Sequence, residues 1–339
     1  MIIKSVPGFE SIIDQEKPIR LLTTFLRKGT IPHALLFTGL EGVGKRTVAL
    51  TFAMACNCVG ERNYSKHQPN SVGPCCRCRS CRKINSGNHP DIIFIKPSGP
   101  YIRIDQIRKL CQTLAMKPYE AKQRVVIISE AQAMNPEASN ALLKALEEPP
   151  ERTILILTAP TSDLLPTIVS RCQNIRFNPI SRKGIENMLI KEQGLQPGNA
   201  KILATIANGS LSKAVSMHKG NWIKKRNWLI NELAALSTRP IETMLAFAEK
   251  LSENKEITRE YLEIITSWFR DLAIFRDSPE KIINKDMLDQ IQYVSQNTMT
   301  AAVLSKIDAI QSAKKKIKAN ANLRLTLEIL TFRLAGVNQ

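Results

Sequence analysis

Short apolar runs alternate with amphipathic stretches through the first half of the chain. The runs contain few polar positions, which is typical of strands buried on both faces of a parallel sheet. They are residues 33–39 (HALLFTG), 91–96 (DIIFIK), 124–129 (RVVIIS), 153–159 (TILILTA) and 172–177 (CQNIRF). The intervening segments, such as IDQIRKLCQTLA and NPEASNALLKALEE, have helical spacing. We therefore expect an α/β domain over residues 1–178, with a parallel sheet and helices on both faces.

Helical patterns replace the strand pattern near residue 179. Three short helices are expected over residues 179–221, and Gly209 and Gly220 mark two of their ends. Longer amphipathic helices are expected over residues 222–339. The pattern thus predicts three parts: an α/β domain, a small helical domain and an all-helical domain.

The composition predicts a soluble globular protein with a basic surface. Hydrophobic residues make up 43% of the chain, charged residues 23%, and the formal net charge is +18. A surplus of positive charge is typical of proteins that bind nucleic acids or other acidic partners. Alternatively, the basic residues form a solvated surface that keeps the chain soluble. Aromatic residues are only 5%, which argues against a platform that stacks single-stranded bases.

The chain lacks an apolar run of about 18 residues, and its first residues lack the pattern of a signal peptide. We therefore expect a cytoplasmic protein with no membrane span. In that compartment its eight cysteines are expected to be metal ligands or buried thiols rather than disulfides.

A glycine-rich loop follows the first predicted strand and opens a helix. Residues 39–47 read GLEGVGKRT, in which Gly39, Gly44 and Lys45 have the spacing of a phosphate-binding loop. Backbone N–H groups of such a loop form an anion site together with the helix N-terminus. The alternative is a tight glycine turn that only joins strand to helix.

Two departures weaken this loop as an ATPase site. Arg46 stands where a Ser or Thr hydroxyl would hold Mg²⁺, and Thr47 follows one place late. Ser129 stands where a strand-end Asp would support the metal, and Glu130 after it is either a catalytic acid or an ordinary exposed one. We expect no intrinsic ATPase activity and no bound Mg²⁺, while ATP binding stays open. The candidate phosphate-loop residues are Gly39, Gly42, Gly44, Lys45 and Thr47.

A cysteine cluster follows the first helix of the predicted sheet domain. Cys75, Cys78 and Cys81 have Cys-x₂-Cys-x₂-Cys spacing, and Cys58 completes four thiolates. Four cysteines form a closed tetrahedral site that is typical of structural zinc. We therefore predict a zinc module over about residues 58–81.

Other residues compete for these positions. Cys56 lies two residues before Cys58 on the helix and so points elsewhere, and Cys76 breaks the spacing. His67 is a further alternative. Cys111 and Cys172 are expected to be buried packing residues.

Several long segments resemble the AAA+ clamp-loader family of bacterial DNA polymerase III. They are IPHALLFTGLEGVGK, IRIDQIRKL, VVIISEAQAMNPEASNALLKALEEPPERTILILTA and LLPTIVSRCQNIRF, followed by NGSLSKAVSMHKGNW and NANLRLTLEILTFRL. The resemblance covers nearly the whole chain. It implies a RecA-like AAA+ domain, then a small helical lid and a helical collar for oligomerisation.

The resemblance also implies a function. Clamp loaders are rings that place a sliding clamp on primed DNA at the expense of ATP, which the gamma or tau subunits hydrolyse. With its degenerate loop, this chain would be a non-catalytic stator. Its partners would be gamma or tau, the delta subunit, and, through the complex, the clamp and primer–template DNA.

One arginine is singled out by the resemblance. The family's Ser-Arg-Cys motif, here Ser170, Arg171 and Cys172, implies that Arg171 enters the ATP site of a neighbouring subunit. A guanidinium beside the γ-phosphate offsets transition-state charge. The alternative is a surface arginine that pairs with a nearby acid.

Three further positions bear on the family comparison. Family motors carry a phosphate-sensing arginine in the lid where this chain has Ser212, and neighbouring Lys213 is an alternative. Thr158 matches a polar residue that reads the γ-phosphate, or it only caps its strand. The family zinc module has a shorter loop, so GERNYSKHQPNS is expected to be an extra surface excursion.

Two other functions are alternatives to the stator. An active gamma- or tau-type ATPase needs the Mg²⁺ support that Arg46 and Ser129 do not supply. A free-standing nucleic-acid-binding protein is suggested by the charge alone.

Overall fold

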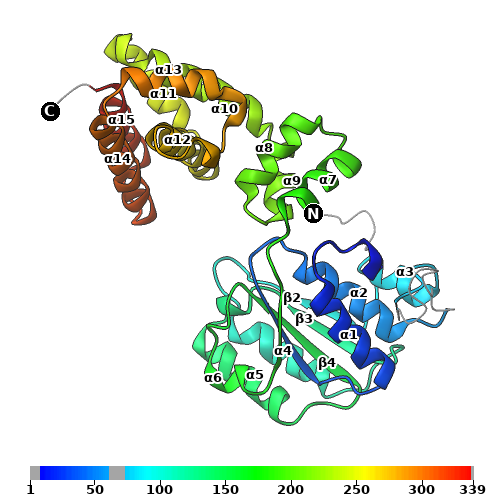
Figure 1. Cartoon of the computed structure of the whole chain (residues 1–339). Coiled ribbons are helices and arrows are strands. Elements are labelled where there is room, and N and C mark those ends of the chain that lie inside the picture. The colour runs from blue at the N-terminus through cyan, green and yellow to red at the C-terminus, as the bar shows by residue number, and fades with distance from the viewer. Residues whose placement is uncertain (1–7, 61–72, 337–339) are drawn as a thin grey trace. The chain divides into compact units, whose positions relative to one another are not determined.

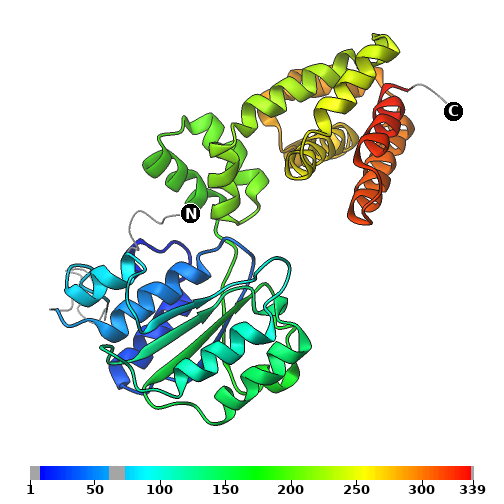
Figure 2. The same cartoon turned by 180° about the vertical axis from the view of Figure 1, so that it is seen from behind.

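The computed structural model describes residues 8–60 and 73–336. They form two compact units: Met1–Ile185 with Ala207–Lys213, and Glu186–Ile206 with Ala214–Gln339. Figures 1 and 2 show both units from opposite sides. The predicted three-part division, with boundaries near 179 and 221, stays a prediction.

Five parallel strands form the sheet of the first unit, in the order β2-β3-β4-β1-β5. The inner strands β1, β3 and β4 are buried along their whole length. Each strand lies within one of the five predicted apolar runs, so the predicted parallel sheet is confirmed. The strands are β1 (Ala34–Thr38), β2 (Ile92–Ile95), β3 (Arg124–Ile128), β4 (Thr153–Ala159) and β5 (Gln173–Arg176).

Helices cover both faces of the sheet, as expected (Figure 1). On one face, α4 (Ile104–Leu114) and α5 (Pro136–Glu147) join the strands in a single buried cluster. On the other, α2 (Lys45–Asn57) packs against β3 and β4, and α1 (Glu16–Lys28) packs against α2. The cluster includes Leu36, Val126 and Leu155 from strands and Ile107 and Leu142 from helices. Shorter elements of this unit are η1 (Phe9–Ser11), α3 (Arg79–Asn85), η2 (Ala131–Ala133) and α6 (Pro166–Val169).

The predicted start of α5 is confirmed in detail. The Asn135 side chain accepts a hydrogen bond from the Ala138 N–H at 3.0 Å, and Pro136 occupies the first turn. The helix ends at Glu147, shortly before Pro149 and Pro150, which cannot continue it. This ending fixes the backbone of Glu147 at the end of a rigid helix.

Residues 207–213 pack with the first unit. The Ile180 N–H donates to the Gly209 carbonyl at 3.0 Å, and the Ser212 N–H donates to the Gly42 carbonyl at 3.3 Å. Local helical spacing does not reveal such pairings between residues far apart in the sequence. The segment therefore lies against the glycine-rich loop.

The second unit consists of helices in its described residues. Helix α11 (Ile241–Leu251) packs against α15 (Leu323–Ala335), and α12 (Lys255–Ile274) packs against α14 (Thr300–Lys318). Within 8–60 and 73–336, none of the helices has the length and apolar character that a membrane span needs. The helices after the sheet are α7 (Arg182–Gln193), α8 (Pro197–Ala207), α9 (Leu211–Lys219), α10 (Trp222–Ala235), α11 (Ile241–Leu251), α12 (Lys255–Ile274), α13 (Leu288–Asn297), α14 (Thr300–Lys318) and α15 (Leu323–Ala335). The short 3₁₀ turns are η3 (Leu236–Thr238), η4 (Pro279–Lys281) and η5 (Lys285–Met287).

A buried polar network joins α10 to α12. Arg226 is fully buried, and its Nη1 donates to Asn284 Oδ1 at 3.1 Å and to Asp286 Oδ1 at 3.0 Å. Asp271 is also fully buried, and its Oδ2 accepts hydrogen bonds of 2.8 Å from both the N–H and the side-chain amide of Asn284. Buried charges of this kind are stable only when their partners are present.

Asp271→Ala is expected to lower the free energy of unfolding of the second unit by about 3–5 kcal/mol, because it leaves buried donors without an acceptor. The exposed Asp308 on α14 provides the matched control, and Asp308→Ala should change stability by no more than about 0.5 kcal/mol. Urea titration followed by tryptophan fluorescence measures both, and equal losses would contradict the expectation. The probes are Trp222, Trp228 and Trp268, all in the second unit.

Candidate functional sites

The glycine-rich loop is closed on itself and against residues 207–213. Lys45 is buried, and its Nζ donates to the carbonyl oxygens of Gly39 and Leu40, the latter at 3.0 Å. Gly42 has a φ of 82°, and a Cβ there would collide with the hydroxyls of Ser210 and Ser212. Burial lowers the pKa of the Lys45 ammonium, although the charge of Glu41 opposes this shift. The lysine expected to meet a phosphate instead contacts the loop's own backbone.

Arg46 and Ser129 are the two residues that depart from the pattern of an ATPase site. Arg46 lies in the first turn of α2, and Ser129 lies directly after β3. Arg46 is the second residue of α2, and its guanidinium lies 5.3 Å from the centroid of the Phe94 ring. Ser129 follows β3 directly, and its N–H donates to the Ile95 carbonyl at 2.9 Å. Thr47 lies half-buried in the first turn of α2. None of these side chains supplies a carboxylate to a metal.

Thr158, the last residue but one of β4, contacts the loop after β3. Thr158 Oγ1 accepts a hydrogen bond of 3.4 Å from the N–H of Glu130. Glu130 is exposed and has a left-handed backbone with a φ of 55°. This contact is the kind expected if Thr158 only caps the end of its strand.

Arg171 lies at the sheet edge opposite the glycine-rich loop. It precedes β5, whose first residue Gln173 pairs with Leu35, whereas Gly39 follows the last residue of the parallel neighbour β1. Four strand residues separate the two edges by about 13 Å at about 3.3 Å per residue. Arg171 therefore lies at the opposite end of the strands from the chain's own loop.

The Arg171 guanidinium forms an ion pair on the surface. Its Nη2 lies 2.8 Å from Oε1 of Glu147, and the two side chains are 35% and 49% exposed. Its Nη1 donates to the Thr167 carbonyl at 3.0 Å and lies 3.5 Å from Ser170 Oγ. The guanidinium is thus held by the end of α5 and by α6, and it remains accessible to solvent.

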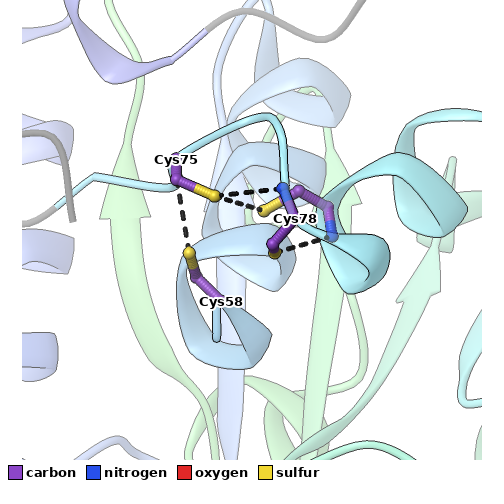
Figure 3. A group of neighbouring side chains, drawn as sticks. Cys58, Cys75 and Cys78 are labelled. Atoms are coloured by element: carbon purple, nitrogen blue, oxygen red, sulfur yellow. Dashed lines mark hydrogen bonds between the residues drawn. The ribbon is translucent and has the colours of Figure 1, made fainter. Parts of the chain in front are cut away.

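The structure brings the four predicted cysteines together. One ligand atom from each of them lies within 4.8 Å of the others, and Cys58, Cys75 and Cys81 are buried. Figure 3 shows the cluster between the end of α2 and the start of α3. Zn–S bonds of about 2.3 Å would put sulfurs about 3.8 Å apart in a tetrahedron, and Cys75 and Cys81 are 4.0 Å apart. The four cysteines fit a single metal ion.

Backbone N–H groups point at these sulfurs. The N–H of Cys75 lies 3.4 Å from Cys58 Sγ, that of Cys78 lies 3.3 Å from Cys75 Sγ, and that of Cys81 lies 3.5 Å from Cys78 Sγ. Burial raises the pKa of Cys78, but N–H groups of Cys81 and Val59 outweigh it and lower that pKa to about 6. Burial raises the pKa of Cys58 and Cys81. Such N–H···S contacts stabilise thiolates, the form that binds metal.

The two competing cysteines lie outside the cluster. Cys56 and Cys76 are outside the cluster, and the exposed Cys76 has its sulfur 3.7 Å from the Pro74 carbonyl. His67 and most of GERNYSKHQPNS lie outside the described residues. Cys111 and Cys172 pack against the main core but are half-buried rather than buried, and burial raises the pKa of Cys172 to about 11.

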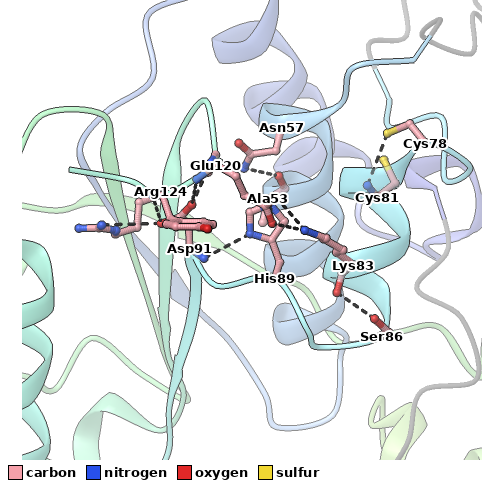
Figure 4. A network of polar contacts seen from close by, with 12 residues as sticks. Ala53, Asn57, Cys78, Cys81, Lys83, Ser86, His89, Asp91, Glu120 and Arg124 are labelled. Atoms are coloured by element: carbon pink, nitrogen blue, oxygen red, sulfur yellow. Dashed lines mark hydrogen bonds and ion pairs between the residues drawn. The ribbon is translucent and has the colours of Figure 1, made fainter. Parts of the chain in front are cut away.

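A polar network that the sequence analysis missed ties the cysteine cluster to the sheet (Figure 4). On α3, Lys83 Nζ lies 2.6 Å from Oε1 of Glu120. Buried Asp91, just before β2, accepts from the N–H groups of Glu120 at 2.8 Å and Ala121 at 2.9 Å, and lies 3.7 Å from Nη2 of Arg124. Burial raises the pKa of Asp91, but these N–H groups and Arg124 outweigh it and lower that pKa. The sequence signal for this network was a charged residue at the start of each of two apolar runs: Asp91 in DIIFIK and Arg124 in RVVIIS.

Known proteins are similar to this chain over most of its length. The family model described as "DNA polymerase III, delta subunit" matches residues 14–181, and "DNA polymerase III, delta subunit, C terminal" matches residues 220–335. DNA polymerase III subunit delta' of Bacillus subtilis is 32% identical over 94% of this chain and 96% of its own length. The Pseudomonas aeruginosa delta' subunit is 31% identical over 90% of this chain and 92% of its own length.

Other similarities are more distant. DNA polymerase III subunit tau of Bacillus subtilis is 28% identical over 96% of this chain and 61% of its own length. A solved structure of a gamma subunit-related protein from Thermotoga maritima has a TM-score of 0.47 at 19% identity, and the match covers 95% of this chain and 99% of that one. The family matches over both units, together with the full-length similarity above 30%, show that the chain belongs to the DNA polymerase III delta' subunit family.

Proposed function

We propose that the chain is a non-catalytic subunit of a DNA polymerase III clamp loader and supplies Arg171 to the ATP site of a neighbouring subunit. The position of Arg171 carries this proposal. It is accessible, and it lies at the sheet edge opposite the chain's own glycine-rich loop. A guanidinium there contacts a triphosphate only when another subunit presents one. The chain is also similar to DNA polymerase III subunits named tau and gamma, which supports an assembly in which such subunits hydrolyse ATP beside it.

The closed loop supports the non-catalytic part of the proposal. Lys45 contacts backbone carbonyls, Gly42 lies against Ser210 and Ser212, and Arg46 occupies the place of the metal-binding hydroxyl. ATP hydrolysis in such loops needs Mg²⁺ that bridges the β- and γ-phosphates. The chain then acts as a fixed partner for the moving ATPase subunits.

The remaining parts of the proposal follow family membership. Residues 1–178 form the AAA+ domain, 179–221 the lid and 222–339 the collar that joins other subunits. The partners are gamma or tau, the delta subunit and, through the complex, the sliding clamp and primer–template DNA in the cytoplasm. Zinc at Cys58, Cys75, Cys78 and Cys81 stabilises the module on α2 and α3 and leaves no open position for chemistry.

An active gamma- or tau-type ATPase is the second candidate, because subunit tau matches 96% of this chain. It would need Lys45 to leave the carbonyls of Gly39 and Leu40, and it would still lack the metal ligands at positions 46 and 129. The contacts favour the non-catalytic subunit.

The purified chain is expected to hydrolyse ATP at background rate, with or without primed DNA, because no metal support is present. A coupled phosphate-release assay measures this beside the cognate ATPase subunit. Lys45→Ala is the control, since residual turnover that survives it comes from a contaminant. Turnover near that of the ATPase subunit, abolished by Lys45→Ala, would contradict the non-catalytic role.

A further inference from the structure

The Arg171 guanidinium has three acceptors around it, and they differ in charge. The Thr167 carbonyl and the Ser170 hydroxyl contact Nη1, whereas the carboxylate of Glu147 contacts Nη2 at 2.8 Å. Glu147 is the last residue of α5, so its backbone is fixed by the buried core beneath that helix. The charged contact comes from a different element than the one that carries Arg171.

This ion pair is open to an incoming anion. Arg171 and Glu147 are 35% and 49% exposed, and an arginine has five N–H donors, so the guanidinium has unused donors toward solvent. A phosphate binds guanidinium in the same forked manner as a carboxylate and carries more charge. A γ-phosphate approaching Arg171 therefore competes with Glu147 for the same group, and the two anions repel each other.

We propose that Glu147 is the resident counter-ion of Arg171, a positioning residue that holds the guanidinium until the γ-phosphate of a neighbouring subunit displaces it. The inference rests on the proposed finger role of Arg171. Exposed ion pairs change an equilibrium by no more than about fivefold. Glu147 is thus strong enough to hold the arginine when no triphosphate is present and weak enough to release it to one.

Glu147→Gln keeps the shape of the side chain and removes its charge. In a loader reconstituted with the cognate ATPase subunits, it is expected to lower the KM for ATP in DNA-stimulated hydrolysis by about 2- to 5-fold. The kcat should stay within about twofold, because the released arginine contacts the γ-phosphate in both ground and transition states. The effect should shrink as salt is raised, since the ion pair is exposed.

Glu148→Gln is the matched control, because Glu148 is the adjacent exposed residue and the change in charge is the same. Glu147→Gln should also have no effect in an Arg171→Ala background, as a double-mutant cycle requires. Identical behaviour of Glu147→Gln and Glu148→Gln, or a raised KM or lowered kcat for Glu147→Gln, would overturn the inference. If Arg171→Ala alone changes nothing, the finger role falls as well. If Arg171→Ala slows hydrolysis and Glu147→Gln is inert, only the counter-ion role falls.

Discussion

Arg171→Ala is expected to slow ATP hydrolysis at the adjoining subunit's site by about 10³–10⁵-fold, the range associated with loss of an arginine finger. The negative charge that develops on the γ-phosphate would lose the guanidinium that offsets it. Other ATP sites in the ring keep their own arginines, so multiple-turnover rates understate the effect. Rapid-quench measurement of a single turnover, with primed DNA and clamp present, separates the slow site from the others.

Two variants sharpen this experiment. Arg171→Lys keeps a positive charge but loses the planar fork, so its rate should fall between those of the native chain and Arg171→Ala. Arg176→Ala removes an exposed arginine at the other end of β5 and should leave the rate unchanged. The ring should still assemble with Arg171→Ala, because the change disrupts only an exposed ion pair. Unchanged single-turnover hydrolysis would remove Arg171 from the finger role.

Removal of the metal is the second large effect that we expect. The purified chain should contain about one zinc ion, and structural zinc typically binds with an apparent free energy of about 10–16 kcal/mol that is coupled to folding. Cys81→Ser replaces a fully buried candidate ligand and should abolish zinc binding and unfold the segment around α3. Elemental analysis gives the metal content, and hydrogen exchange of residues 73–90 reports on local folding.

Cys76→Ser is the matched control, because Cys76 is exposed and lies outside the cluster. It should retain the zinc and the exchange protection of the native chain. A Cys81→Ser protein with native protection, or a native protein that is folded without metal, would contradict a structural zinc site.

The elements of the first unit could be predicted because their signals are local. Five apolar runs became the five strands, and Asn135-Pro136 marked the start of α5. The buried network of Arg226 and Asp271 could not be predicted, since the two residues lie in different amphipathic helices and meet only through Asn284, which lies in neither helix. Pairings of this kind depend on the path of the chain between the partners.

The sequence by itself determined the parallel sheet, the four cysteines of the candidate metal site and the residues that make the glycine-rich loop unlike an ATPase site. Each rests on residue identity or short spacing, which folding does not change. Only the tertiary structure decided that Lys45 contacts its own loop, that residues 207–213 lie against Gly42, and that Glu147 holds Arg171 at the opposite sheet edge. These contacts join side chains whose orientation is set by packing of separate elements, and no local pattern encodes it.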